Sequence, residues 1–432
     1  MDNHDDNVKV FIGDMRDMSS FVYRFANMRK VVRTNKNTKK KKFWLIGEEK
    51  EIVFERPELI LTQDAATSNQ NAYLNHVITP DAIKLFLELN RKWFLQPDPG
   101  ALLQFDPNET SDERMALEDK LKELTKDNFK IVDYEDEFSS WNGGLVYAVV
   151  TNLTKKYVAV IFRGTVGVTD AFTDLNFALN TEDFFKEEGS IFVEGNKPGT
   201  HDGFTKYLFE NREGGNRAYV DRIIACVEDQ FEKNEDVKGK GFKFYVSGHS
   251  LGGGLANLFG FRVAQLKRME HPSVEHFPPR VKVMSYASPC VGDEAYNKEF
   301  MYLESEKILR HIRVSNETDV VPTFNIDAPY RFLITGDTSL YTQNGMNLFL
   351  RPDGQKMVDS YGNPKEFSSQ FSLLGAMTSL VAHSLVTHEE RMHYDENEEV
   401  FDQTVEELYA THVKFSVTKV GDEVLDVSYS VP

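Results

Sequence analysis

The sequence predicts an α/β fold in which a central, mostly parallel sheet is covered by helices on both faces. Two observations support this prediction. From about residue 143, short runs rich in β-branched and aromatic residues alternate with segments of helical periodicity, an order typical of parallel sheets with crossover helices. One strand-like run leads through a serine between two glycines into a helical segment, which indicates a sharp strand-to-helix turn.

Apolar runs of strand length predict the strands of this sheet, which are expected over 145–151, 157–162, 242–246, 281–287 and 308–314. A helix is expected over 220–231, where apolar residues recur at three- and four-residue spacings, and another over 255–266. Strands that alternate with helices in this way predict a sheet buried on both faces.

The first 130 residues are expected to form an N-terminal extension, and the α/β domain is expected over 131–432. Within the extension, a capping-box sequence at 110–113 precedes leucines on one helical face, which predicts an amphipathic helix. Four consecutive lysines at 39–42 are expected to lie in a solvated loop. The sequence assigns no role to this extension.

Composition narrows the range of functions. The 432-residue chain has a formal net charge of -18, which argues against non-specific binding of nucleic acid, since that requires a basic field. The start of the chain is acidic and polar, and the longest weakly polar run, 371–386, is too short and polar to predict a membrane span. We therefore expect a soluble, cytoplasmic protein without a transmembrane segment.

The strongest chemical signal is the segment Gly248-His249-Ser250-Leu251-Gly252. Its position between a strand and a helix is the context of the nucleophile elbow of α/β hydrolases, in which the serine takes strained dihedral angles. Such a turn places the Ser250 hydroxyl at the positive end of the helix and leaves the Leu251 N–H able to donate to an oxyanion. Ser250 is the predicted nucleophile.

A serine nucleophile requires a histidine base and an orienting carboxylate, which follow the serine in the order acid, then histidine in this fold. Asp319, just beyond the strand at 308–314, is the predicted acid, with Glu317 as its rival. The histidine cluster at 383–393 supplies the base. His388 is favoured, and His383 is the alternative.

The oxyanion requires a second donor beside the Leu251 N–H. Thr165 follows the predicted strand 157–162 almost directly. A residue just past a strand end can aim its backbone N–H and its hydroxyl at the same point as the Leu251 N–H. Thr165 is therefore the predicted second donor.

Taken together, several segments resemble the class 3 lipases, the fungal-lipase-like branch of the α/β hydrolases. These segments occur in the family's order at 162–165, 201–204, 248–253, 286–289, 291–292 and 319–322. The resemblance implies a Ser250–Asp319–His388 triad, an oxyanion hole from Thr165 and Leu251, and a lid from residues 166–172, followed by 174–177.

The same resemblance implies hydrolysis of lipid carboxylic esters. An acylglycerol is the expected substrate, with phospholipid or galactolipid left open, and transient contact with a lipid surface is expected. No metal and no organic cofactor is implied. Two other classes of function stay open: a catalytically inactive lipase-like binding or regulatory protein, and an esterase that acts on non-lipid esters.

Overall fold

An eight-stranded sheet forms the centre of the molecule, with the strand order β1-β2-β3-β6-β7-β8-β9-β10. The computed structural model describes residues 7–34, 128–136, 145–164, 179–180, 198–210, 218–319, 321–323, 341–352, 356–361, 383, 385–392, 403–420 and 423–431. The sheet strands are β1 (Phe129–Asp136), β2 (Val146–Asn152), β3 (Tyr157–Phe162), β6 (Lys243–His249), β7 (Val281–Tyr286), β8 (Leu309–Asn316), β9 (Met346–Leu350) and β10 (Lys356–Tyr361). Neighbours from β3 through β9 run parallel, whereas β1, β2 and β10 join the edges by antiparallel pairing. The predicted mostly parallel sheet is confirmed.

The central strands are buried on both faces, as strand β3 illustrates. All of its residues are buried. Tyr157, Ala159 and Ile161 belong to one apolar core, and the alternating residues belong to the other, because successive side chains of a strand point to opposite faces. A strand covered on both sides must be apolar along its whole length, which is why these runs stood out in the sequence.

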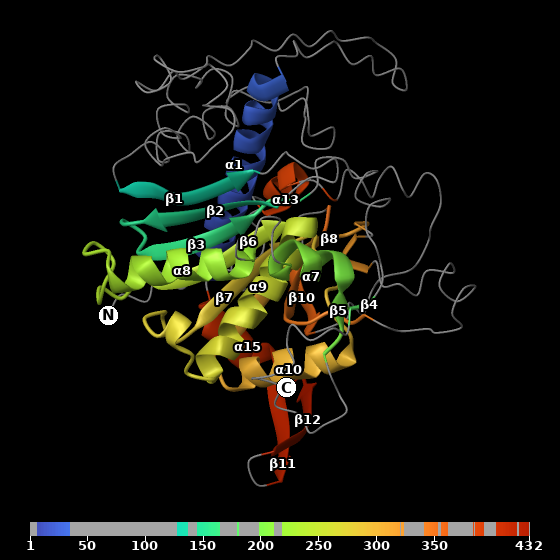
Figure 1. The fold of residues 1–432 in the computed structure, drawn as a ribbon. Coiled ribbons are helices and arrows are strands. Elements are labelled where there is room, and N and C mark those ends of the chain that lie inside the picture. The colour runs from blue at the N-terminus through green and yellow to red at the C-terminus, as the bar shows by residue number, and fades with distance from the viewer. Residues whose placement is uncertain are drawn as a thin grey trace, which may run out of the picture.

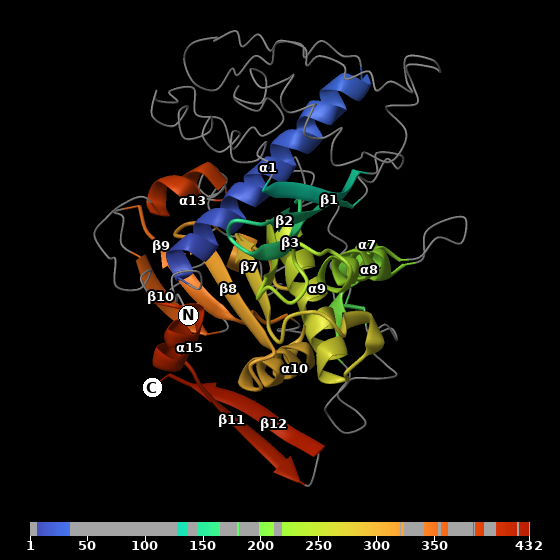
Figure 2. The same cartoon turned by 90° about the vertical axis from the view of Figure 1, so that its left-hand side faces the viewer.

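Helices cover the two faces of the sheet (Figure 1, Figure 2). One face carries α7 (Asp202–Phe209), α8 (Tyr219–Glu232) and α9 (Leu251–Arg268), whose apolar side chains fill one core with the strands. The other face carries α1 (Val8–Thr34), which crosses the sheet diagonally in Figure 2, and α13 (Leu385–Met392). The remaining helices of the described residues are α10 (Glu294–Ser305), α15 (Val405–His412) and the short 3-10 turns η3 (Pro272–Val274) and η4 (Val321–Thr323).

Two small antiparallel pairs complete the described fold. Strands β4 (Leu179–Asn180) and β5 (Thr200–His201) pair with each other. At the C-terminal end, β11 (Lys414–Val420) and β12 (Glu423–Ser430) form a hairpin that extends beyond α10 (Figure 1). Lys298 of α10 and Asp426 of β12 form an ion pair at 3.1 Å.

Helix α1 is the main element that the sequence analysis did not foresee. It lies within the predicted N-terminal extension, yet its apolar side chains share one core with β1, β3 and β7. In particular, Ser19 of α1 lies 3.5 Å from Ser247 of β6, hydroxyl to hydroxyl. The start of the chain is therefore part of the same folded unit as the sheet. The predicted lysine-rich loop at 39–42 and the helix after 110–113 lie outside the described residues.

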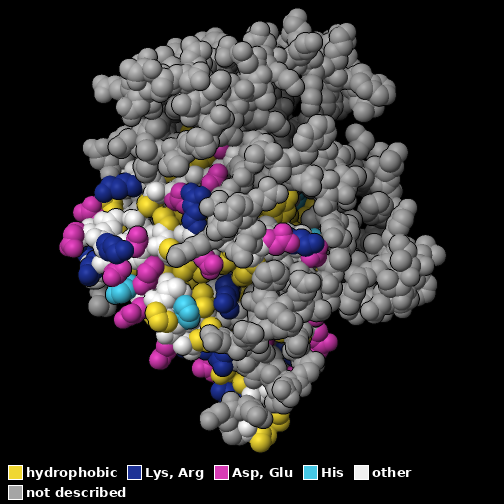
Figure 3. All heavy atoms as spheres, in the orientation of Figure 1, with side chains coloured by type: hydrophobic (Ala, Val, Ile, Leu, Met, Phe, Trp, Pro, Cys, Tyr) yellow, Lys and Arg dark blue, Asp and Glu magenta, His cyan; other side chains and the backbone are white. Residues whose placement is uncertain are grey.

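Charges of both signs are interspersed among the described residues around α8 on the face shown in Figure 3. Lys233 pairs with Asp229, Lys130 with Asp236, and the His276 ring with Glu228. Exposed pairs of this kind contribute little to stability.

Among the described helices, none combines the length and the apolar character that crossing a membrane requires.

Candidate active site

Ser250 occupies a strained turn between β6 and α9. Its φ of 57° and ψ of -128° lie outside the regions that non-glycine residues prefer. A side chain on Gly248 would place its Cβ 2.2 Å from the carbonyl oxygen of Gly252, and one on Gly252 would place its Cβ 2.3 Å from that of Phe162. Only glycines fit at these two positions. The predicted sharp turn is therefore present, and the flanking glycines leave the room that it needs.

The turn places Ser250 at the N-terminus of α9. Leu251 is the first residue of this helix, and the first N–H groups of a helix have no acceptor within the helix. These groups also lie at the positive end of the helix dipole. The Leu251 N–H can therefore serve an anion that develops beside Ser250.

Asp319 lies fully buried in the loop that follows β8. Its carboxylate accepts a hydrogen bond from the Val321 N–H at 3.0 Å. The Nδ1 atom of His383 lies 3.0 Å from one oxygen of this carboxylate and 3.2 Å from the other. Glu317, the rival acid, has its backbone N–H bonded to the carbonyl oxygen of Leu350 and is less buried than Asp319. Of the two acids, Asp319 is the one that meets a histidine.

His388, which the sequence favoured as the base, has a different neighbour. Its Nδ1 lies 2.9 Å from the side-chain amide nitrogen of Asn316. An amide nitrogen only donates, so this ring nitrogen accepts. One turn later in α13, Arg391 donates to the carbonyl oxygens of Glu317 and Leu350. The His388 and Arg391 side chains thus attach α13 to the ends of β8 and β9. The histidine that contacts Asp319 is His383.

Gly164 brings the chain from β3 directly against the elbow. A Cβ on Gly164 would lie 2.3 Å from the Tyr23 hydroxyl, 2.6 Å from the carbonyl oxygen of His249 and 3.1 Å from the Ser250 Cβ. The next residue is Thr165, the predicted second oxyanion donor. Thr165 and the predicted lid at 166–172 and 174–177 lie outside the described residues.

Comparison with known proteins places part of this chain in a family. A family model described as "Lipase (class 3)" matches residues 159–328, the part of the chain that contains the elbow and Asp319. These residues form a class 3 lipase domain. The domain has the α/β-hydrolase fold expected from the sequence.

Three plant proteins illustrate the relatives of this lipase domain. Phospholipase A1-Igamma3, chloroplastic, of Arabidopsis thaliana is 24% identical, over 47% of this chain and 38% of its own length. Phospholipase A1-II 6 of Oryza sativa subsp. japonica is 25% identical, over 51% of this chain and 53% of its own length. Galactolipase DONGLE, chloroplastic, of Arabidopsis thaliana is 25% identical, over 46% of this chain and 42% of its own length. The chain thus spans about half or less of the curated relatives it matches.

Solved structures of fungal lipases are similar to this chain with a lower sequence identity than the plant relatives. Rhizomucor miehei triacylglyceride lipase is 20% identical, and the similarity covers 60% of this chain and 84% of that one with a TM-score of 0.41. A triacylglycerol lipase from Penicillium expansum is 19% identical, with 52% and 70% covered and a TM-score of 0.38.

Another predicted motif of the lipase domain, at 201–204, packs against α9. The His201 ring stacks on Phe204 with their centroids 4.2 Å apart. A Cβ on Gly254 would lie 2.7 Å from the Phe204 ring, so the aromatic ring lies directly against the helix that follows Ser250. Burial lowers the pKa of His201 to about 4, which keeps this ring neutral. The motif supports the position of α9 by packing.

Two side chains near the elbow were not assigned a role in the sequence analysis. The Tyr23 hydroxyl and the His249 ring are hydrogen-bonded across 226 positions of sequence, and the His249 ring meets the backbone of His383 across 134 positions. No local pattern of residues predicts contacts between positions so far apart in the sequence.

Within the described residues, no group of three or more His, Cys, Asp or Glu side chains is arranged to hold a metal ion.

Proposed function

We propose that this protein hydrolyses carboxylic esters of lipids, with Ser250 as the nucleophile, Asp319 as the acid and His383 as the base. The observation that carries the proposal is the contact of the buried Asp319 carboxylate with His383 Nδ1 at 3.0 Å. The His383 ring in turn lies 4.8 Å from the ring of His249, centroid to centroid, and His249 directly precedes Ser250. Asp319 and His383 thus lie beside the residue that directly precedes the serine, which supports their assignment to the triad.

The geometry supports the usual division of roles in such a triad. Asp319 orients His383 through Nδ1–H, which leaves Nε2 as the basic nitrogen. His383 takes the Ser250 proton as the serine oxygen bonds to the ester carbonyl carbon. It then gives that proton to the leaving alcohol oxygen. Water next attacks the carbonyl carbon of the acyl-enzyme while His383 takes a proton from the water, and His383 returns a proton to Ser250 as the acid product leaves.

The oxyanion formed at each step is stabilised by backbone donors. We assign this role to the Leu251 N–H and to Thr165, as the sequence predicted. The close approach of Gly164 to Ser250 supports the assignment of Thr165, because Thr165 is the next residue in the chain. Removing one such donor typically costs about 3–4 kcal/mol of transition-state stabilisation.

In this proposal His383 replaces His388 as the base. The contact between His388 Nδ1 and the Asn316 amide supports a role for His388 in attaching α13 to the sheet. A base requires an orienting carboxylate. The Asp319 carboxylate contacts His383 Nδ1, so it can orient the His383 ring.

We propose an acylglycerol as the substrate class, reached by transient contact with a lipid surface. The names of the plant relatives, phospholipase A1 and galactolipase, make esters of polar lipids the main rivals. The cytoplasmic location remains a prediction from the sequence, and two of the relatives named above are called chloroplastic.

The test is hydrolysis of a panel of emulsified triacylglycerol, diacylglycerol, phospholipid and galactolipid, together with labelling by a fluorophosphonate. We expect Ser250→Ala and His383→Ala to abolish both, and His388→Ala to retain labelling. A wild-type protein that neither labels nor hydrolyses any lipid would instead indicate a lipase-like binding protein. A rate on soluble short-chain esters that does not rise when the substrate forms droplets would indicate an esterase.

A further inference from the structure

The ring of His249 connects three parts of the fold. Its Nε2 lies 2.6 Å from the backbone carbonyl oxygen of His383, and its Nδ1 lies 3.2 Å from the hydroxyl of Tyr23. Tyr23 belongs to α1, and His249 is the last residue of β6. One imidazole thus joins the N-terminal helix, the elbow and the proposed base.

These contacts determine which ring nitrogen carries the proton. A carbonyl oxygen only accepts, so Nε2 must be the N–H donor. In a neutral imidazole the other nitrogen is then an acceptor. The Tyr23 hydroxyl lies 3.2 Å from this nitrogen and 3.4 Å from the backbone carbonyl oxygen of His249, so both acceptors of the Tyr23 proton belong to His249. Tyr23 therefore donates to the ring or the backbone of His249, and the His249 ring donates to the His383 carbonyl.

Burial keeps both groups in the protonation states that this arrangement needs. His249 is 4% exposed and Tyr23 is 3% exposed. Burial lowers the pKa of His249 well below its usual value, and the neighbouring His383 and His388 lower it further. Burial raises the pKa of the Tyr23 hydroxyl, although Arg163 and a backbone hydrogen bond with Gly164 act in the opposite direction.

The backbone of His383 needs such support. His383 stands on a turn two residues before α13 begins, outside the helix itself. A base that is displaced by about 1 Å can lose a factor of about 100 in rate. The hydrogen bond from the His249 ring to the His383 carbonyl limits such a displacement of His383, because His249 directly precedes Ser250.

We propose that His249 is a positioning residue, which holds the backbone of His383 against the elbow, and that Tyr23 of α1 orients the His249 ring. This inference rests on the proposed function of His383 as the base. Its consequence is that the N-terminal helix takes part in catalysis indirectly, through Tyr23, His249 and the His383 carbonyl.

The test compares variants that keep or remove single links. Tyr23→Phe removes the hydroxyl and keeps the ring. His249→Gln keeps an amide N–H near the position of Nε2, whereas His249→Leu removes every donor. Ser19→Ala is the matched control, because Ser19 is also a buried hydroxyl of α1 facing β6, and it contacts Ser247 rather than His249.

We expect kcat on the best lipid of the panel to fall roughly 10- to 100-fold in His249→Leu and several-fold in Tyr23→Phe, with KM little changed. His249→Gln should recover most of the loss. Tyr23→Phe should add little in the His249→Leu background, because both changes interrupt the same chain of contacts. Ser19→Ala should keep the kcat of the wild type.

Two results would overturn the inference while leaving the proposed function intact: wild-type kcat in both Tyr23→Phe and His249→Leu, or equal losses in Tyr23→Phe and Ser19→Ala with no recovery in His249→Gln. If His249→Leu does not fold, the comparison of Tyr23→Phe with Ser19→Ala decides alone. A wild-type protein that hydrolyses no lipid and resists the fluorophosphonate would refute the proposed function itself.

Discussion

His383 Nδ1 lies 3.0 Å from one carboxylate oxygen of Asp319 and 3.2 Å from the other, and both side chains are almost wholly removed from solvent. A buried carboxylate has lost its contact with water and depends on the hydrogen bonds it accepts. The pair therefore holds the histidine ring in one orientation and one tautomer, and stabilises positive charge on that ring.

The first prediction concerns this pair. We expect Asp319→Asn to lower kcat by about 10⁴-fold, because an amide in place of the carboxylate favours the wrong tautomer of the histidine. Steady-state kinetics on a lipid ester measures the effect. Glu317→Gln, two residues earlier, is the matched control and should retain activity. Equal losses in the two variants would contradict the assignment of Asp319.

The second prediction concerns Gly164. We expect Gly164→Ala to lower kcat at least 10-fold, because its Cβ would lie 2.3 Å from the Tyr23 hydroxyl and 2.6 Å from the His249 carbonyl oxygen. Both neighbours would have to move, and the chain leading to Thr165 with them. Gly203→Ala, whose Cβ would come no closer than 3.3 Å to the His201 ring, serves as the control. Unchanged kinetics in Gly164→Ala would show that the elbow tolerates this displacement.

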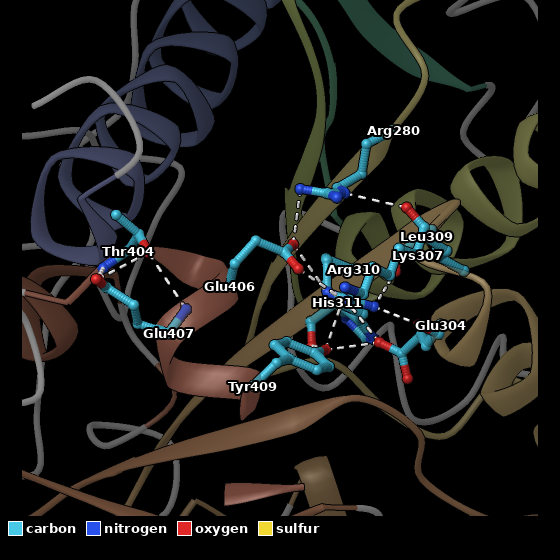
Figure 4. Close-up of polar contacts among 10 residues, drawn as sticks. All are labelled: Arg280, Glu304, Lys307, Leu309, Arg310, His311, Thr404, Glu406, Glu407 and Tyr409. Atoms are coloured by element: carbon cyan, nitrogen blue, oxygen red, sulfur yellow. Dashed lines mark hydrogen bonds and ion pairs between the residues drawn. The ribbon is translucent and has the colours of Figure 1, made fainter. Parts of the chain in front are cut away.

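The third prediction concerns how the stability of the folded protein depends on pH. Glu304 of α10 is fully buried, and burial raises its pKa to about 7. Its carboxyl group accepts hydrogen bonds from the Tyr409 hydroxyl at 2.6 Å and the His311 N–H at 3.0 Å, and Arg310 beside it pairs with Glu406 (Figure 4). The folded protein therefore keeps the Glu304 proton over a pH range in which the unfolded chain has lost it.

The sign of the effect follows from proton binding. Between about pH 4.5 and 7 the folded state binds more protons at this site, so its contribution to the free energy of unfolding falls as pH rises. The total loss is on the order of a few kcal/mol. Denaturant unfolding at several pH values measures it. Glu304→Gln should flatten the curve over this range, whereas Glu317→Gln should not; a curve of the same slope in Glu304→Gln would contradict the prediction.

The fourth prediction tests whether α1 belongs to the folded unit. Gly13 lies within this helix, and a Cβ added there would meet nothing within 4 Å. Because alanine favours the helix over glycine, Gly13→Ala should raise the free energy of unfolding by about 0.5–1 kcal/mol. Thermal or denaturant unfolding of the whole chain gives the value. No change in stability would mean that α1 does not unfold together with the sheet.

The sheet and the elbow could be predicted because their causes are local. Strands covered on both faces must be apolar throughout, so β3 and β7 appear as continuous runs, and the turn at Ser250 needs glycines at the flanking positions. Asp319 could be proposed from its place just beyond a strand. The helix start at Leu251, four residues before the predicted 255, follows from the elbow itself, since Ser250 is the N-cap.

The sequence by itself therefore determined the class of fold, the bend at Ser250 and the choice of Asp319 as the acid to test. The tertiary structure decided which of two histidines five positions apart meets Asp319, because that depends on how α13 packs against the ends of β8 and β9 through His388 and Arg391. It also decided the place of α1, whose contacts join residues more than 200 positions apart. Such contacts arise only when the chain folds back on itself, and no local pattern of residues encodes them.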